Sequence, residues 1–293
     1  MLGGVNDTED VRMIVRWVIA VVSLFFFQGL FASASFERVK SLPPELKESS
    51  GLVYVKPYLW TIVDSTDTRL YALSPVTGQV VKKVLVKGVE NHDWESIARD
   101  DRYLYIGDVG NNAGNRRDIA IYRLPLTTLR QAVVNDVKTF HVNYYAYTPK
   151  LFPYAHDFDA EALLVSDKSI LVVTKNWRSG GATLYRLPKR PGRHEARPFG
   201  RLHFSGMVTA ASWEDNVVSF LSYQPGLFGF RVSLRQWMWP GGETMWASSV
   251  FHTEVLPVTC QAEGLTHTRD KLWVTCEGNA AHPAQLFVGR YRG

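Results

Sequence analysis

A short strand-like pattern recurs along this chain and places an oxygen-bearing side chain at the same point in each copy. Three copies centre on a glutamate, in Asp93–Ala98, Asp159–Leu164 and Gln261–Thr266. Each is followed by a second apolar segment that ends in a polar residue, at Asp108, Lys175 and Glu277. Repetition at intervals of this length is typical of radial or solenoid architectures.

Two weaker copies carry a hydroxyl group in place of the glutamate. Ser50–Leu52 leads to the segment Leu59–Asp64, and Thr209–Ala211 leads to Val218–Tyr223. The five repeats therefore start at Ser50, Glu95, Glu161, Thr209 and Glu263, which lie 45, 66, 48 and 54 residues apart. Equivalent positions in successive repeats are expected to face a common axis.

The repeats have the pattern of strands and not of helices. Apolar and polar residues alternate over short segments rich in β-branched and aromatic residues, with Gly, Asp, Asn and Ser between them. No segment after residue 40 keeps a helical apolar period beyond two turns. Four-stranded repeats of this length predict an all-β fold, a five-bladed β-propeller, with a six-bladed propeller as the alternative.

The last repeat ends before its fourth strand. We expect Phe36–Lys40, which precedes the first repeat, to supply that strand by pairing with Leu286–Arg290. Such a pairing closes the ring and leaves fewer exposed strand edges.

The N-terminal segment has the pattern of a secretory signal peptide. The uncharged apolar run 17–27 follows Arg12 and Arg16 and precedes Ala32-Ser33-Ala34, which resembles a cleavage site. Residues 1–34 are therefore predicted to be removed, which leaves 35–293 as a single propeller domain that is secreted or periplasmic.

Two alternatives remain for this segment. The acidic residues at 7–10 are unusual before a signal sequence, so Met13 is a candidate for the true start. The segment could also stay uncleaved as an anchor, but its apolar run is short for a membrane span. We therefore expect no stable span after cleavage.

The charge of the chain excludes one class of partner. The net charge is +5, and the basic residues are scattered apart from the run Lys189–Arg193, which is best interpreted as a solvated loop. Nucleic-acid binding is therefore not expected.

The only cysteines, Cys260 and Cys276, lie on what would be paired strands, which favours a disulfide in an oxidising compartment over two buried thiols.

The repeat starts predict a metal site. In a propeller the first strand of each blade lines the central channel, so Ser50, Glu95, Glu161, Thr209 and Glu263 would form one ring. Clustered carboxylates require raised pKa values or a bound cation. Carboxylates and hydroxyls are the hard oxygen ligands that Ca²⁺ prefers, and the lack of inward His or Cys argues against zinc. The alternative is a wet channel in which Lys or Arg neutralises the acids.

A second set of residues is expected at the channel mouth, where the second strand of each repeat ends. The candidates for ligand binding there are Asp64, Asp108, Asn111, Asn112, Lys175, Asn176, Arg178, Tyr223 and Glu277. A face that mixes acids over a metal with Lys and Arg suits a small anionic or phosphorylated ligand. Asn111 and Asn112 also fit ordinary turn chemistry.

Sequence motifs give little support to catalysis. The chain has no nucleophile elbow, zinc-protease helix, phosphate-binding glycine loop or dinucleotide fingerprint. If a base exists, the candidates are Asp93 and Asp159, two residues before their glutamates.

These motifs resemble two groups of proteins. Ser50–Leu52, Asp93–Ala98, Ile106–Asn112 with Ile121–Pro125, and Asp159–Leu163 are similar to secreted bacterial propellers with TolB-like or phytase-like repeats. That resemblance covers almost all of the chain after the signal peptide and implies fold more than activity. The order hydroxyl, Glu, Glu, hydroxyl, Glu also resembles the calcium site of five-bladed apyrases, the calcium-activated nucleotidases. The nucleotide-facing segments of that family have no counterpart here.

The sequence thus favours a propeller with a central Ca²⁺ that acts as a ligand-binding module. One alternative is a Ca²⁺-dependent phosphohydrolase acting on a nucleotide or phosphate ester. Another is a structural or protein-interaction platform with a protein partner. The ring pattern favours the ligand-binding module over both alternatives, because it supplies a metal site but no nucleophile.

Overall fold

The computed structural model describes residues 36–149, 152–203, 205–227, 229–239 and 252–290. They belong to one compact unit, Phe36–Gly293. The predicted signal peptide, residues 1–34, lies outside the described residues. Among the described residues, no helix is long and apolar enough to cross a membrane.

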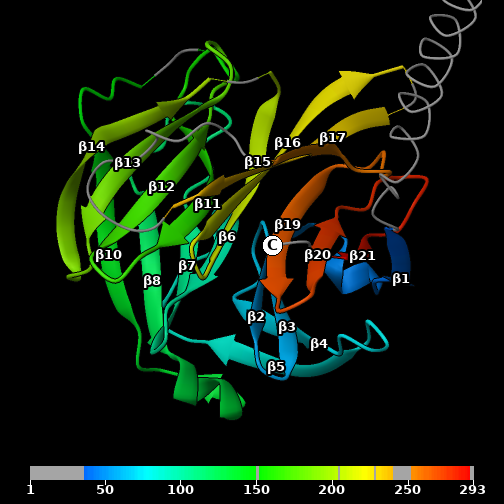
Figure 1. Ribbon diagram of the computed structural model, residues 1–293. Helices are drawn as coiled ribbons and strands as arrows, with labels where there is room; N and C mark the ends of the chain where they lie inside the picture. Colours follow the sequence, from blue (N-terminus) through cyan, green and yellow to red (C-terminus); the bar gives the residue numbers. More distant parts are fainter. Residues whose placement is uncertain (1–35, 150–151, 204, 228, 240–251, 291–293) are drawn as a thin grey trace, which may run out of the picture. The chain divides into compact units, whose positions relative to one another are not determined.

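The described chain is built almost wholly of antiparallel strands (Figure 1). The first repeat contains β2 (Ser49–Val55), β3 (Tyr58–Val63), β4 (Arg69–Leu73) and β5 (Val80–Val86). The second contains β6 (Trp94–Arg99), β7 (Tyr103–Asp108), β8 (Ala120–Pro125) and β10 (Lys138–Tyr144). The third contains β11 (Asp159–Val165), β12 (Ser169–Lys175), β13 (Ala182–Pro188) and β14 (Gly192–Leu202).

The remaining strands complete the same pattern. The fourth repeat contains β15 (Met207–Glu214), β16 (Val217–Gly226), β17 (Gly229–Met238) and β18 (His252–Val255). The last contains β19 (Ala262–Thr268), β20 (Lys271–Cys276) and β21 (Gln285–Arg290), joined by β1 (Glu37–Ser41). Two short 3₁₀ helices, η1 (Pro44–Leu46) and η2 (Leu126–Arg130), and the short strand β9 (Val133–Val134) lie in connections.

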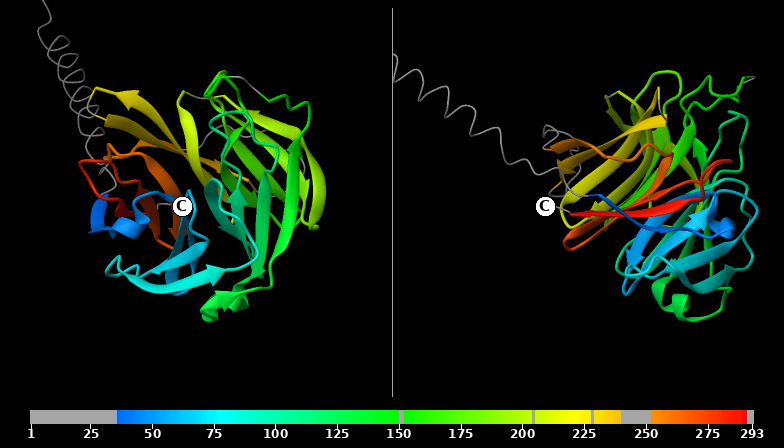
Figure 2. Two further views of the ribbon diagram at one scale, coloured as in Figure 1. Left: turned by 180° about the vertical axis from the view of Figure 1, so that it is seen from behind. Right: turned by 90° about the vertical axis from the view of Figure 1, so that its right-hand side faces the viewer.

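The first strands of the repeats, called the inner strands below, form a ring. β2 lies beside β6, β6 beside β11, β11 beside β15, β15 beside β19, and β19 beside β2. The sheets stand outward from this ring, as the views from behind and from the side also show (Figure 2). The prediction of a β-propeller is therefore confirmed.

The N-terminal strand closes the ring as predicted. β1 pairs antiparallel with β21, with Glu37 opposite Val288 and Ser41 opposite Gln285. The ring of Phe36 also lies against the backbone of Gly289, where a Cβ atom would overlap it. This strand joins residues from the two ends of the domain into one sheet.

The hydrophobic core lies between neighbouring sheets. Alternate side chains of a strand point to opposite faces, so each sheet contributes one face to each of two apolar layers. Between the first two repeats, Trp60 and Ile62 of β3 pack in one cluster with Trp94 and Ile97 of β6. The third and second repeats are further joined because β10 and β14 pair in parallel.

Candidate functional site

The five predicted ring positions share one backbone feature. The pairing of each inner strand with its neighbour skips one residue, between Ser49 and Gly51, Trp94 and Ser96, Ala160 and Ala162, Val208 and Ala210, and Ala262 and Gly264. The skipped residues are Ser50, Glu95, Glu161, Thr209 and Glu263. A β-bulge of this kind re-aims the side chain of the extra residue. The five positions are therefore structurally equivalent, as the repeat alignment predicted.

The two hydroxyl groups of this set bind backbone carbonyls. Ser50 Oγ donates a hydrogen bond to the carbonyl oxygen of Trp94, at the start of the next inner strand. Thr209 Oγ1 donates likewise to Ala262 O at 2.5 Å. Both side chains are buried. In this structure they tie neighbouring inner strands together, and neither lines the cavity described next.

The three glutamates of the set open into one cavity. Glu95, Glu161 and Glu263 are all buried and line a cavity of about 320 Å³ at the starts of the inner strands. The other residues that line it are Asp64, Asp93, Asn112, Tyr154, Lys175, Trp177, Tyr223, Gln261 and Glu277. The cavity thus gathers six carboxyl groups around one ammonium group among the described residues.

Lys175 is the internal counter-charge of this cavity. Its Nζ lies 3.0 Å from Glu161 Oε1, and both side chains are buried. The ammonium group also lies 4.8 Å from the ring centre of Trp177 and 5.3 Å from that of Tyr223. Burial lowers the pKa of Lys175, but Glu161 and Tyr223 outweigh it and hold the pKa above its usual value. Lys175 is therefore charged at neutral pH.

Gln261 bridges two carboxyl groups on the other side of the cavity. Its Nε2 donates to Glu263 Oε1 at 2.7 Å and to Glu277 Oε2 at 2.6 Å. Burial and the adjacent Glu263 raise the pKa of Glu277 to about 11. Glu277 therefore keeps its proton at neutral pH unless a cation replaces it.

The remaining acids have raised pKa values for the same reason. Burial, followed by Glu161 and Asp93, raises the pKa of Glu95 well above its usual value. Burial and the charge of Asp159 raise the pKa of Asp93 to about 6. The Asp93 carboxyl group lies against Gly110, where any Cβ atom would overlap it, so this approach requires glycine. The cavity therefore favours either protons or a bound cation.

Four of the predicted ligand-binding residues lie elsewhere. Asp108 is buried in an ion-pair cluster, 3.1 Å from Arg116 and 3.2 Å from His92. Asn111 is buried and orders its loop, since its Oδ1 accepts a hydrogen bond from Arg116 N. Asn176 accepts a hydrogen bond from Thr174 Oγ1 within a hairpin. These three are structural in this arrangement.

Arg178 is the fourth residue outside the cavity. It lines a separate cavity with His156 and Arg201, and its backbone N donates to Asp157 Oδ1. Lys175 and Arg178, the two basic residues among the predicted ligand-binding candidates, therefore line different cavities.

The two candidate bases have different surroundings. Asp93 lines the cavity. Asp159 is buried, with Oδ1 accepting from Asn111 N at 2.6 Å and Oδ2 from Trp177 Nε1 at 2.7 Å. Asp159 therefore positions the indole that faces Lys175, and it does not line the cavity itself.

Sequence reasoning missed three residues of the site, Gln261, Trp177 and Tyr154. Gln261 stands two residues before its glutamate, the position that Asp93 and Asp159 hold in their repeats, so the repeat alignment contained this signal. Trp177 and Tyr154 come from loops and contact each other, with ring centres 4.7 Å apart. No periodic pattern marks them.

The side chains do not form a ready metal cage. Within the described part of the chain, no group of three His, Cys, Asp or Glu side chains is placed to hold a metal ion. Carboxylate and hydroxyl oxygens are ligands that Ca²⁺ prefers, but one glutamate is engaged by Lys175 and both hydroxyl groups by the backbone. Binding a divalent ion here requires movement of these side chains.

Close to the cavity, Cys260 and Cys276 are joined by a disulfide with Cα atoms 5.8 Å apart. Cys276 ends β20, next to Glu277. The bridge links the start of the last repeat to its second strand. It fixes the segment that carries Gln261 and Glu263.

Comparison with known proteins gives no family. No family model and no curated protein matches the sequence. The chain is similar to solved structures of a glutaminyl cyclase from Myxococcus xanthus (11% identity, TM-score 0.49, 88% of this chain and 97% of that one) and of the WD40 repeats of RRP9 (11%, 0.47, 89% and 98%). A glycosyl hydrolase from Bacteroides ovatus gives 9% identity, a TM-score of 0.48, and 88% and 94% coverage. Such distant likenesses indicate nothing about ligand or reaction.

Proposed function

We propose that this propeller is a binding module that takes up a cation at the mouth of its central channel, with Ca²⁺ as the first candidate. The observation that carries the proposal is the convergence of Glu95, Glu161 and Glu263, each from a bulge, into one acid-rich cavity. A structural core has no need of such a cluster, because buried carboxyl groups are costly. A bound cation offsets that cost.

The charge of the cavity also decides against a bare anion. Six carboxyl groups face one ammonium group there, so a phosphate would enter only together with a cation. The anionic or phosphorylated ligand considered from the sequence, and hydrolysis of a phosphate ester, therefore gain no support from the positions of the described residues.

Lys175 acts in this proposal as a tethered substitute for the ligand. Its ammonium group pairs with Glu161 and lies near the rings of Trp177 and Tyr223, and proteins hold free cations by the same kinds of contact. An incoming ion has to compete with it. Removal of the Lys175 charge should then strengthen cation binding, whereas removal of a glutamate charge should weaken it.

The test is a melting-temperature titration with CaCl₂, MgCl₂ and spermidine, since a ligand that binds the folded state alone raises the melting temperature. We expect Ca²⁺ to raise it, Lys175→Met to lower the concentration required, and Glu95→Gln or Glu263→Gln to weaken the response. The matched control is Glu90→Gln, because Glu90 is largely exposed and does not line the cavity.

The result that overturns the proposal is also definite. If none of the three cations changes the melting temperature of the wild-type protein or of Lys175→Met, the cavity is not a cation site. A response to spermidine alone would retain the cation site but exclude calcium as its ligand.

The predicted secretion of the chain is tested separately, by locating the protein in cell fractions.

A further inference from the structure

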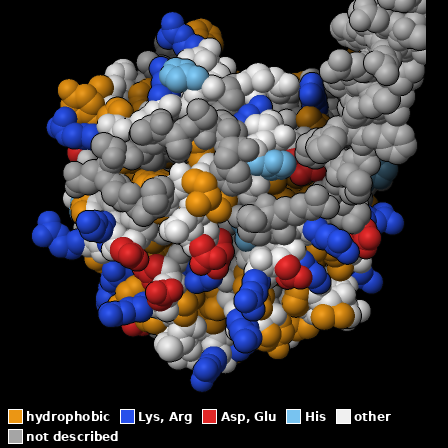
Figure 3. Space-filling model, in the orientation of Figure 1, with side chains coloured by type: hydrophobic (Ala, Val, Ile, Leu, Met, Phe, Trp, Pro, Cys, Tyr) orange, Lys and Arg blue, Asp and Glu red, His pale blue; other side chains and the backbone are white. Residues whose placement is uncertain are grey.

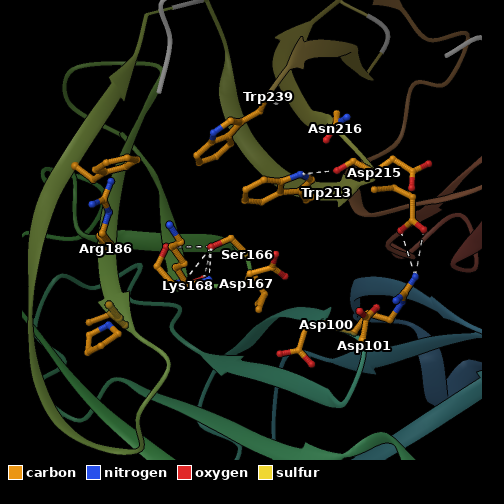
Figure 4. A pocket seen from close by; sticks show the side chains of 17 residues that line it. Asp100, Asp101, Ser166, Asp167, Lys168, Arg186, Trp213, Asp215, Asn216 and Trp239 are labelled. Carbon is orange, nitrogen blue, oxygen red and sulfur yellow. Dashed lines mark hydrogen bonds and ion pairs between the residues drawn. The ribbon is translucent and has the colours of Figure 1, made fainter. Parts of the chain in front are cut away.

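A second, larger cavity lies at the opposite ends of the inner strands. It has a volume of about 790 Å³ and shares no lining residue with the acid-rich cavity (Figure 4). Its walls come from the turns that follow β6, β11 and β15, at Arg99–Asp101, Val165–Ser169 and Glu214–Asn216, and from Arg186–Pro188 and Phe199. A volume of this size accommodates a ligand of a few hundred daltons.

Two stacked indoles form one wall of this cavity. The rings of Trp213 and Trp239 lie 4.2 Å apart and only 15° from parallel. Trp213 Nε1 also donates to Asp215 O at 3.1 Å, which fixes the orientation of that indole. Trp213 stays partly exposed, and Figure 4 shows both indoles on one side of the cavity. A flat, rigid apolar platform is thus available to a ligand.

The turns around the cavity carry exposed acidic, basic and amide side chains. Asp101, Asp167, Lys168 and Asn216 are exposed residues of the turns, and they provide carboxylate, ammonium and amide groups. Two further acids are engaged by the protein itself. Asp100 accepts from Lys189 Nζ at 2.6 Å and from two backbone N–H groups, and Glu214 pairs with Arg99.

We propose that this cavity is a saccharide-binding site that takes a neutral oligosaccharide. A pyranose ring has a flat C–H face that packs on an indole, and its hydroxyl groups need donors and acceptors together. Carboxylate and amide groups on the rim supply both. An apolar ligand would bury these groups without partners, and the acids, which outnumber the bases in the lining, disfavour an anion.

The binding experiment uses cellotriose, maltotriose and triacetylchitotriose as probes, followed by tryptophan fluorescence and calorimetry on the full chain. At least one trisaccharide should bind. Trp213→Ala should weaken that binding about tenfold or more, because stacking supplies much of the affinity, and Trp213→Phe should restore part of it. Asp167→Asn tests the polar wall with an exposed turn residue whose substitution spares the fold.

The control is the same substitution in the other cavity. Trp177→Ala alters the acid-rich site and should leave trisaccharide affinity unchanged, just as Trp213→Ala should leave the cation response unchanged. If no trisaccharide binds, the proposal is overturned. If trilysine binds and the trisaccharides do not, the cavity is a site for basic peptides and the saccharide proposal is likewise wrong.

Discussion

The two ends of the inner strands carry opposite kinds of chemistry on one scaffold. Where the strands begin, bulges turn acidic side chains into a small buried cavity. Where they end, ordinary turns surround a larger cavity with indoles and exposed polar groups. The ion pairs follow the same division. Glu161 and Lys175 are 2% and 5% exposed, whereas Glu214 and Arg99 are 38% and 26% exposed.

This difference shows how the backbone controls the energy of a charge. A bulge adds one residue to the inner strand and leaves it unpaired, so its side chain is directed inward without disturbing the rest of the sheet. The turns at the far end place their charged residues in water, where each pair contributes little. On the face seen in Figure 3, acidic and basic side chains are likewise interspersed and form no single patch.

Opening the ring should cause the largest loss of stability, because the ring positions both ends of the inner strands. Deletion of residues 36–41 removes β1 and leaves β21 with an unpaired edge. We expect the free energy of unfolding to fall by a large fraction of the roughly 5–15 kcal/mol that is usual for a domain. Urea unfolding followed by circular dichroism measures it, with a chain that begins at Ser35 as the reference.

Both cavities should be lost together in that deletion. Calcium response and trisaccharide binding should disappear in parallel, because the ring positions the inner strands at both ends. If the deleted chain unfolds at the same urea concentration as the reference, the pairing of β1 with β21 contributes nothing to the closure of the ring.

Breaking the buried ion pair of Lys175 and Glu161 should cause the next largest loss of stability. Lys175→Met leaves Glu161 without its counter-charge in a buried position, which costs about 3–5 kcal/mol when one partner is removed. Replacing both partners, as Glu161→Gln with Lys175→Met, should recover much of that loss. A double-mutant cycle of unfolding free energies checks this, and purely additive losses would show that the two groups do not interact.

Much of the acid-rich site could be predicted from the sequence, because the repeats mark it. The five equivalent positions follow from one recurring pattern, and the strand closure follows from the missing fourth strand of the last repeat. A basic counter-charge in the channel also appeared, as the alternative to a metal, but the sequence did not single out Lys175 for it. In contrast, the hydrogen bonds of Ser50 and Thr209 to backbone carbonyls depend on the spacing of neighbouring inner strands, which no repeat encodes.

The second cavity could not be predicted in the same way. Its walls come from turns in three repeats and from outer strands, and these residues share no period. Trp213 lies on β15 and Trp239 follows β17, so the pairing of both strands with β16 is needed to bring the two indoles together. Aromatic residues are common throughout the chain, so composition gives no signal for this pair.

The acid-rich end should also make the stability of the protein depend on pH. Burial, followed by Glu48, raises the pKa of Asp64 from 3.8 to about 7. Because the folded state binds the proton more tightly, this group stabilises the fold below pH 4, and the contribution is lost as the pH rises towards 7. Asp64 is partly exposed, so we expect a loss of only about 1–2 kcal/mol after solvent screening.

Unfolding free energies at pH 4, 5.5 and 7, without added metal, test this expectation. Asp64→Asn should remove that part of the slope, and Glu48→Gln should reduce it. An unchanged slope in Asp64→Asn would assign the pH dependence to other acids of the cavity. If Ca²⁺ replaces protons in the acid-rich cavity, its addition should reduce the fall of the unfolding free energy at the higher pH values.

The smallest effect is expected at the far end, in the pair of Arg99 and Glu214. Arg99 Nη2 lies 3.2 Å from Glu214 Oε1, and Arg99 Nε donates to Tyr54 O at 2.8 Å. Water screens the charges of a half-exposed pair, so Arg99→Ala should cost about 1 kcal/mol or less. Its effect should shrink further in high salt, because screening weakens exposed pairs more than buried ones. Unfolding free energies of Arg99→Ala and Lys175→Met, measured at low and high salt, give the comparison directly. Equal losses in the two variants would mean that burial does not separate the two ends in the way their positions imply.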